Sequence, residues 1–262
     1  RRTRELCDRY GIRIILDATR IAENAYFIKR RERGYSSRSI REIVREMFSY
    51  VDGFTFSAKK DALVNIGGIL GMRDKTLYEK CRNRSIQIEG FESYGGMACR
   101  DVEAMARGLY EGTDDSYVES YCGQVEYLGR RLKSMGIPII EPIGGHAVYI
   151  DAKRFLPHVP QSEFPAHTLV VHLYLEGGVR ALEIGSVGFS KKVNGRWVYP
   201  KLEMTRLALP RRVYTREHLD HVVETVAKVF RKRSMIRGFR MVYEAPELRH
   251  FTFRMKPIKP LS

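Results

Sequence analysis

The distribution of apolar and polar positions predicts short strands that alternate with helices in the first part of the chain. The apolar run IRIILD (residues 12–17) is typical of a buried strand, and the run starting at residue 53, GFTFS, predicts a second one. Between them, residues 23–33 have the pattern of a helix. Another helix is predicted to begin at Ser39, because Glu42 follows three residues later as in a capping box. This alternation predicts an α/β domain with a mainly parallel sheet.

The pattern continues with a third strand in residues 62–72, broken by glycines, and then with helices from about residue 99 and over 115–134. After Gly136 and Pro138 the pattern of apolar and polar positions changes. The segments that follow predict a strand–turn–strand unit, a helix closed by glycines, another strand and an amphipathic helix: IPIIEP with GGHAVYIDA, EFPAHTLVVHLYLEGG, KLEMTRLALP and TREHLDHVVETVAKVF. We therefore expect two domains, an α/β part in residues 1–130 and a smaller α+β domain in residues 131–262.

The composition changes this picture little. Hydrophobic residues make up 44% and charged residues 29% of the chain, as in ordinary soluble proteins. No apolar run reaches the roughly 20 residues that a membrane helix needs, and the start RRTRELCDRYG has no signal-peptide pattern. The four cysteines form no CxxC pair, so we interpret them as reduced thiols of a cytoplasmic protein and expect no metal site there.

The formal net charge of +15 raises the question of a nucleic-acid partner. The basic residues concentrate in residues 29–45 and 228–240, where acidic or apolar residues interrupt them at helical spacing. Such runs are typical of a solvated helix face, and no known nucleic-acid-binding motif accompanies them. We therefore do not expect nucleic acid as a partner. A non-catalytic basic binding module stays an alternative of another class.

The candidate chemistry lies at the ends of the first two predicted strands. The first ends with Asp17, and the second runs through Ser57 to Lys59 and Lys60. In open α/β sheets, ligands bind at the carboxyl ends of strands. A lysine that forms a Schiff base and a carboxylate that pairs with a pyridine nitrogen are what a pyridoxal-phosphate site needs, and Ser57 could hydrogen-bond the phosphate. An Asp after a strand is also a common turn former, and paired lysines are commonly solvated.

The amino-acid sequences of several segments favour a pyridoxal-phosphate site. The segments LDATRIAENAYFIK, SAKKDALVNIGGILGM, EGFESYGGMACRDVEAMARGLYEG, IEPIGGHAVYIDAKRFLPHVPQSEFPA, LEMTRLALPRRVYT and YEAPELRHFT resemble the tryptophanase and tyrosine phenol-lyase family, in the family's order. The resemblance runs from the first residues to about residue 252. It implies the fold type I architecture of pyridoxal-phosphate enzymes, with the first part of this chain as a partial large domain and the second as a small C-terminal domain.

The resemblance also implies roles in the cofactor site. Lys60 matches the lysine that holds pyridoxal phosphate, and Lys59 its neighbour that helps order the site. Asp17 matches the partner of the pyridine nitrogen and Arg20 the contact to the cofactor's 3-oxygen. Asn65 matches a position whose backbone oxygen joins a monovalent-cation site, usually filled by potassium.

Other matches concern the substrate. Arg206 matches the arginine that binds the α-carboxylate of the amino acid in a bidentate fork. His146 matches a histidine near the domain interface, and it could equally be a core residue.

Two positions bear on the choice of substrate. Ile184 stands where phenol-lyases have an arginine that meets the phenol ring, and His250 stands where they tend to have phenylalanine. Both are the tryptophanase choices, and an apolar side chain suits an indole face. Other positions resemble the phenol-lyases instead, namely Asn65 and the segments SYGG and CRDVEAMA. We expect β-elimination of tryptophan to indole, pyruvate and ammonia, with tyrosine phenol-lyase activity as the alternative.

The family resemblance has consequences for the whole protein. Family members extend well beyond this length at the N-terminal end, where they carry a phosphate-binding loop and an aromatic residue that stacks on the cofactor. We therefore expect a truncated fragment or a split gene product that by itself binds the cofactor poorly. The resemblance implies a homotetramer at full length.

Overall fold

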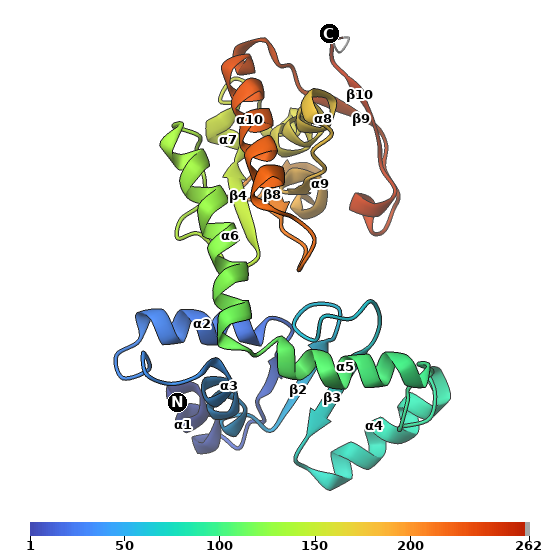
Figure 1. Ribbon diagram of the computed structural model, residues 1–262. Coiled ribbons are helices and arrows are strands. Elements are labelled where there is room, and N and C mark those ends of the chain that lie inside the picture. The colour runs from blue at the N-terminus through green and yellow to red at the C-terminus, as the bar shows by residue number, and fades with distance from the viewer. Residues whose placement is uncertain (260–262) are drawn as a thin grey trace. The chain divides into compact units, whose positions relative to one another are not determined.

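The computed structural model describes residues 1–259, and the chain divides into two compact units, Arg1–Tyr121 and Cys122–Ser262 (Figure 1). We describe each unit by itself. The division falls inside helix α6 (Asp115–Ser134), which belongs in part to both. The domain boundary that we expect from the sequence, between residues 130 and 131, lies in the same helix and stays a prediction.

Unit 1 is a mixed α/β structure. Its elements before α6 are α1 (Arg2–Arg9), β1 (Ile15–Asp17), α2 (Ile21–Arg31), α3 (Ile40–Ser49), β2 (Gly53–Ser57), β3 (Gly68–Met72), α4 (Lys75–Ile88) and α5 (Cys99–Glu111). The helix expected at Ser39 is confirmed as α3, because the Ser39 hydroxyl accepts a hydrogen bond from the backbone N–H of Glu42 and the Glu42 carboxylate accepts one from the backbone N–H of Ser39.

The sheet of unit 1 has the strand order β1–β2–β3. Strands β1 and β2 are parallel, with Asp17 opposite Thr55, as the alternation of strands and helices predicts. Strand β3 is antiparallel to β2 and covers only the second part of the strand that we expect over residues 62–72. The first part is a turn, since Leu63 and Gly67 both have positive φ angles, which a strand does not accommodate.

The core of unit 1 forms where helices α2 and α3 pack against each other. Their inward positions are fully covered: Ala18, Ile21, Ala22, Ala25, Ile40 and Ile43 are all at most 4% exposed. These residues recur at helical spacing, so burial of one apolar stripe stabilises both helices. The packing holds the loop after β1, and with it Asp17, against the end of β2.

Unit 2 is an α+β structure built around a second sheet. Its elements after α6 are β4 (Ala147–Asp151), α7 (Ala152–Phe155), η1 (Gln161–Glu163), α8 (Pro165–Gly177), β5 (Leu182–Ile184), α9 (Ser186–Phe189), β6 (Lys191–Val193), β7 (Arg196–Val198), β8 (Met204–Ala208), α10 (Arg216–Arg231), η2 (Arg233–Met235), β9 (Phe239–Tyr243), η3 (Arg249–Phe251) and β10 (Arg254–Pro257).

The main sheet of unit 2 has the order β4–β8–β5, and all of its pairs are antiparallel. Helix α8 packs against β5 and β8, and α10 packs against α8 (Figure 1). Val148, Ile150 and Leu207 are buried, whereas Tyr149 and Arg206, which alternate with them, are only half-buried. One face of this sheet therefore forms the core, and the other stays accessible.

The helices expected in unit 2 are confirmed as α8 and α10, and α8 ends at Gly178 in the left-handed conformation. The first strand of the expected strand–turn–strand unit is reduced to an isolated bridge between Ile139 and Ile150. Helix α4 is not predicted by the hydrophobic pattern, because none of its residues is buried.

Acidic neighbours meet several residues of the basic runs. Lys29 donates to Asp115 at 2.6 Å, Arg38 pairs with Glu46, and Lys232 pairs with Glu176. Each of these pairs lies within one unit. Part of the excess positive charge is thus used in local ion pairs.

Among residues 1–259, no helix combines the length and the apolar character that a membrane crossing requires.

Candidate functional site

The carboxyl ends of β1 and β2 bring the predicted cofactor residues of unit 1 into one neighbourhood. Asp17 is the last residue of β1 and Ser57 the last of β2, and the two strands are parallel neighbours. Lys60 follows in a turn in which its N–H donates to the backbone oxygen of Ser57, and its Nζ donates to Ser57 Oγ at 2.8 Å. The lysine side chain thus folds back over the end of its own strand.

The carboxylate of Asp17 is held in its ionised form. Hydrogen bonds from the side chain and the backbone of Thr19 lower its pKa, and the positive charges of Arg20 and Lys60 lower it further. The backbone bond from Thr19 to Asp17 Oδ1 measures 3.1 Å. Thr19 Oγ1 in turn accepts from the backbone N–H of Ser57 at 3.3 Å, which ties the two strand ends together.

Arg20 sits at the N-cap of α2 beside this carboxylate. Its Nε is buried and has no hydrogen-bond partner within the part of the chain that the structure describes. A buried N–H donor without a partner is costly and commonly marks the place of a ligand oxygen or a water. The start of α2 is fixed by Asp61, whose buried carboxylate accepts from the backbone N–H of Ala22 at 2.9 Å.

Gly108 in α5 and Gly112, which caps its C-terminus, let this helix touch the backbone of the lysine loop. A Cβ on Gly108 would lie 1.7 Å from the backbone oxygen of Ala62, and one on Gly112 would lie 1.7 Å from that of Asp61. The two glycines are four residues apart and share one helix face. Any larger side chain would push α5 off the segment that follows Lys60, so these positions support the loop.

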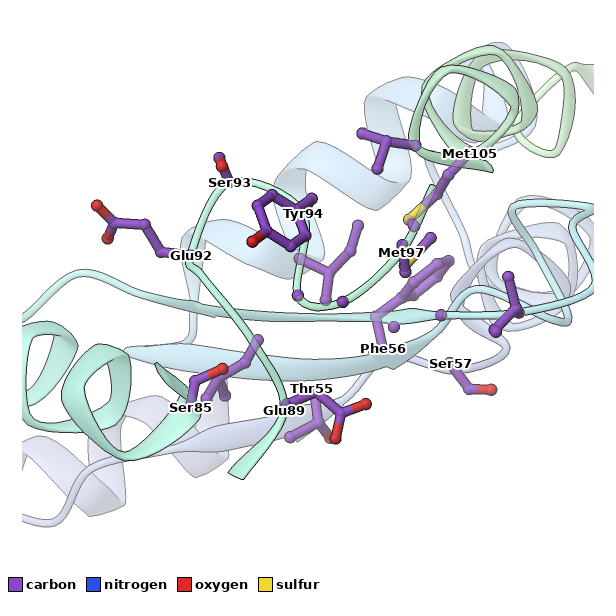
Figure 2. A pocket seen from close by; sticks show the side chains of 18 of the residues that line it. Thr55, Phe56, Ser57, Ser85, Glu89, Glu92, Ser93, Tyr94, Met97 and Met105 are labelled. Atoms are coloured by element: carbon purple, nitrogen blue, oxygen red, sulfur yellow. The ribbon is translucent and has the colours of Figure 1, made fainter. Parts of the chain in front are cut away.

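A cavity of about 1070 Å³ borders the strand ends. It is lined by Asp17, Thr19, Ser57 and Lys59, whereas Lys60 is not part of its lining. Figure 2 shows the side chains of Phe56, Met97 and Met105 gathered on one side of the strand, with the Ser57 hydroxyl pointing away from them. The adjacent lysines therefore differ in setting, since Lys59 is exposed and Lys60 is half-buried.

The residues at the strand ends fit pyridoxal phosphate. They supply an amine within hydrogen-bond reach of a hydroxyl, an ionised carboxylate and a buried guanidinium N–H that lacks an acceptor. A pyridine N–H, a phenolic oxygen and a phosphate are the complementary groups of that cofactor.

In unit 2, Arg206 and Ile184 lie on the accessible face of the β4–β8–β5 sheet. Arg206 pairs with Leu182 on β5 and with Tyr149 on β4, and Ile184 pairs with Met204. Residues that face each other across antiparallel strands share a face, so Ile184 is a diagonal neighbour of Arg206. The Nε of Arg206 is buried and, within residues 1–259, lacks a hydrogen-bond partner, as that of Arg20 does.

The other predicted residues lie outside these two clusters. His250 is exposed and belongs to η3, where its ring packs on Phe251 with centroids 4.0 Å apart. His146 is half-buried just before β4, and its backbone oxygen accepts from Leu209. Asn65 is exposed in the loop before β3. The roles predicted for these residues stay predictions.

Two carboxylates lie next to Ile184, the half-buried Glu183 and the buried Glu203. Glu203 is 1% exposed and accepts from the backbone N–H and the hydroxyl of Ser186 at 2.7 and 2.5 Å. Glu183 accepts from the backbone N–H of Val187 at 3.0 Å. Burial, together with the charge of Glu203, raises the pKa of Glu183 to about 7.

The substitution Glu183→Gln is expected to stabilise unit 2 at neutral and alkaline pH. Because the pKa of Glu183 is raised in the folded state, the free energy of unfolding falls as pH rises from the ordinary glutamate pKa of 4.5 to about 7. The loss persists at higher pH. The amide carries no charge and keeps the acceptor for Val187. We expect a gain on the order of 2 kcal/mol at about pH 8 and none at about pH 4 in denaturant unfolding.

The matched control is Glu176→Gln. The hydrogen bond from Lys232 lowers the pKa of Glu176, so Glu176→Gln should reduce the stability of the protein at pH values above 4.5. An equal gain at both pH values for Glu183→Gln would contradict the assigned cause.

Sequence reasoning missed several residues that organise these clusters. Thr19 and Asp61 bond the strand ends and the start of α2, and Tyr149 faces Arg206 across the sheet. The sequence Asp-Ala-Thr at residues 17–19 could have indicated Thr19, because an Asp side chain commonly accepts a hydrogen bond from the backbone N–H two residues later. No local signal indicates Tyr149, whose neighbour is distant in sequence.

Comparison with known proteins gives consistent matches. A family model described as beta-eliminating lyase matches residues 1–225. A tyrosine phenol-lyase from Intrasporangium calvum is 54% identical over 258 residues, covering 98% of this chain and 54% of the relative. A tryptophanase from Salinibacter ruber is 51% identical over 260 residues, covering 99% of this chain and 55% of the relative. The chain spans about half the length of the curated relatives it matches.

Solved structures agree on the fold. The serine palmitoyltransferase of Sphingomonas wittichii superposes with a TM-score of 0.58 at 13% identity, covering 89% of this chain and 51% of that one. At this identity the likeness concerns architecture alone. The α/β fold type I class expected from the sequence is thus confirmed.

Proposed function

Because the chain belongs to the beta-eliminating lyase family, we propose that it carries the lysine half of a pyridoxal-phosphate site that eliminates the β-substituent of an aromatic L-amino acid. The observation that carries this proposal is the arrangement at the strand ends, where Asp17 ends β1 and Lys60 lies in the turn after β2, the parallel neighbour of β1. Tryptophan is the proposed substrate, and with one water it yields indole, pyruvate and ammonia.

The cofactor, when bound, withdraws electrons from the Cα of the amino acid. Lys60 is proposed to hold it covalently through Nζ and, once displaced by the substrate amine, to accept the Cα proton. Asp17, kept ionised by Thr19, accepts the hydrogen bond of the pyridine N–H and so keeps that nitrogen protonated. Arg20 would donate its Nε–H, which has no acceptor among the described residues, to the 3-oxygen.

Two neighbours are proposed to complete the cofactor's surroundings. Ser57 already accepts from Lys60, so its own hydroxyl proton remains to be donated to a phosphate oxygen. Lys59 faces the large cavity and is proposed to order the site through its charge.

Arg206 is proposed to bind the α-carboxylate of the substrate. Its Nε–H is buried and has no acceptor among residues 1–259, and a carboxylate supplies two acceptor oxygens in the matching geometry. Ile184 on the same sheet face offers an apolar surface to the aromatic ring. His250 is proposed to donate a proton or a hydrogen bond to the leaving aromatic group.

Further parts of the proposal follow from the family alone. They are a potassium ion at the backbone oxygen of Asn65, a homotetramer for the whole protein and a cytoplasmic location. The role of His146 is left open between a contact near the domain interface and a core position.

Tyrosine phenol-lyase activity is the second candidate. It is favoured by the 54% identity to the Intrasporangium calvum enzyme, against 51% to the Salinibacter ruber tryptophanase. Ile184 argues for tryptophan, because an apolar side chain offers nothing to a phenolic hydroxyl, whose rejection or acceptance depends on hydrogen bonds.

The test is a parallel assay of indole release from tryptophan and phenol release from tyrosine by the full-length protein. We expect the indole rate to exceed the phenol rate by at least about 10-fold in kcat/KM. The variant Ile184→Arg should reverse or narrow this ratio, because a guanidinium is unpaired against indole and pairs with a phenolic oxygen.

Two results would count against the proposal. Faster phenol release by the unsubstituted protein would favour the second candidate. No release of either product, together with salt-dependent retention on heparin, would favour a non-catalytic basic binding module.

A further inference from the structure

A single helical turn directly follows the strand that carries Ile184. This turn, α9, is held at its first end by two carboxylates, since Ser186 donates its N–H to the buried Glu203 at 2.7 Å and Val187 donates to the half-buried Glu183 at 3.0 Å. Negative groups at the N–H end of a helical turn satisfy donors that have no partner inside the turn.

The backbone oxygens of the same two residues, Ser186 and Val187, are held by Arg249. This residue donates from Nη2 to the backbone oxygen of Ser186 at 2.6 Å and from Nε to that of Val187 at 2.8 Å. Its side chain is only 14% exposed, and its guanidinium lies 4.7 Å from the Trp197 ring. A planar guanidinium can bridge two adjacent carbonyls in this way, which an ammonium group cannot match.

The next residue along the chain is His250. The Cβ and Cγ of His250 lie 3.8 Å from the position that a Cβ on Gly188 would take, so the histidine rests on the turn that Arg249 holds. His250 itself is exposed, and its ring also packs on Phe251 in its own 3-10 turn. Its placement over α9 therefore depends on the neighbouring arginine.

We propose that Arg249 is a positioning residue that sets His250 over α9, beside the strand bearing Ile184, for the departure of the aromatic group. The inference rests on the proposed function, in which His250 serves that group. The arginine contacts neither substrate nor cofactor in this scheme. It acts by joining the segment with His250 to the two carbonyls of the turn.

The test compares Arg249→Lys with the matched control Arg254→Lys in the full-length holoenzyme. Arg254 lies on the following strand, and its guanidinium stands over the ring of Tyr243. Two substrates are used: tryptophan, whose ring carbon must be protonated as its bond to Cβ breaks, and a cysteine S-conjugate of an acidic thiol, which leaves as the thiolate.

We expect Arg249→Lys to lower kcat for tryptophan about 10-fold or more, while kcat for the S-conjugate changes less than about threefold. The control should leave both rates unchanged. A parallel fall with both substrates, or no fall with either, would overturn the proposal, because a merely structural residue affects both reactions alike.

A second measurement does not depend on turnover. In the chain itself, nuclear Overhauser contacts between the His250 ring and the Gly188 α-protons should be present, and they should weaken in Arg249→Lys but persist in Arg254→Lys. If the unsubstituted enzyme released no indole, the proposed function would be wrong. The nuclear Overhauser contacts would then be the test of whether Arg249 positions His250. Unchanged contacts in Arg249→Lys would refute its positioning role.

Discussion

Replacing Lys60 with alanine is expected to abolish the visible absorbance of the lysine–pyridoxal linkage in the full-length protein and to lower kcat by at least about 10³-fold. The reason lies in the turn after β2. Nζ of Lys60 is held by Ser57 Oγ at 2.8 Å, next to an aspartate whose pKa is lowered in part by the charge of this lysine. Its loss removes both the covalent attachment and the proposed acceptor of the Cα proton.

The matched control is Lys59→Ala. Lys59 is exposed and lines the large cavity, so its removal should leave the absorbance band intact. Spectroscopic titration with pyridoxal phosphate and single-turnover kinetics measure the two effects separately. If the band persisted in Lys60→Ala, or were lost only in Lys59→Ala, the assignment of the cofactor attachment to Lys60 would be wrong.

Arg206→Lys should raise KM for the aromatic amino acid, and we expect kcat/KM to fall by roughly 10²-fold or more, since a charged hydrogen bond lost at a buried site costs about 3 kcal/mol. Arg206 has a buried Nε–H without a partner and faces Tyr149 on the accessible side of its sheet. A lysine keeps the charge but offers no planar pair of donors to a carboxylate.

The amide of the same amino acid provides the discriminating substrate. It lacks the carboxylate, so its already poor turnover should be insensitive to the change at Arg206. The control variant is Arg180→Lys, because Arg180 is exposed in the loop before β5. Equal losses with the acid and the amide would show that Arg206 serves the structure of the sheet and does not bind the substrate.

The local features of this chain could be read from its sequence. Ser39 and Glu42 form the capping box, and Gly178 ends α8 in the left-handed conformation, because such contacts join residues close in sequence. The adjacency of Asp17 and Lys60 also followed, since two strands linked by a helical segment become parallel neighbours whose carboxyl ends meet.

Other features depended on contacts that no local pattern encodes. Helix α4 escaped the hydrophobic pattern because it buries no side chain, although Asp74 caps it by accepting from Leu77 at 2.8 Å. The antiparallel direction of β3 follows from the turn at Leu63 and Gly67, where backbone conformation overrides the apolar run.

The sequence by itself determined which residue types stand at the strand ends and hence which cofactor they could hold. The tertiary structure decided how they are partnered. It showed that Arg20 and Arg206 each keep a buried N–H without an acceptor in the part of the chain that the structure describes, and that Glu183 and Glu203 share one turn with Arg249. Pairings of this kind join residues far apart in the chain, and only packing and register bring them together.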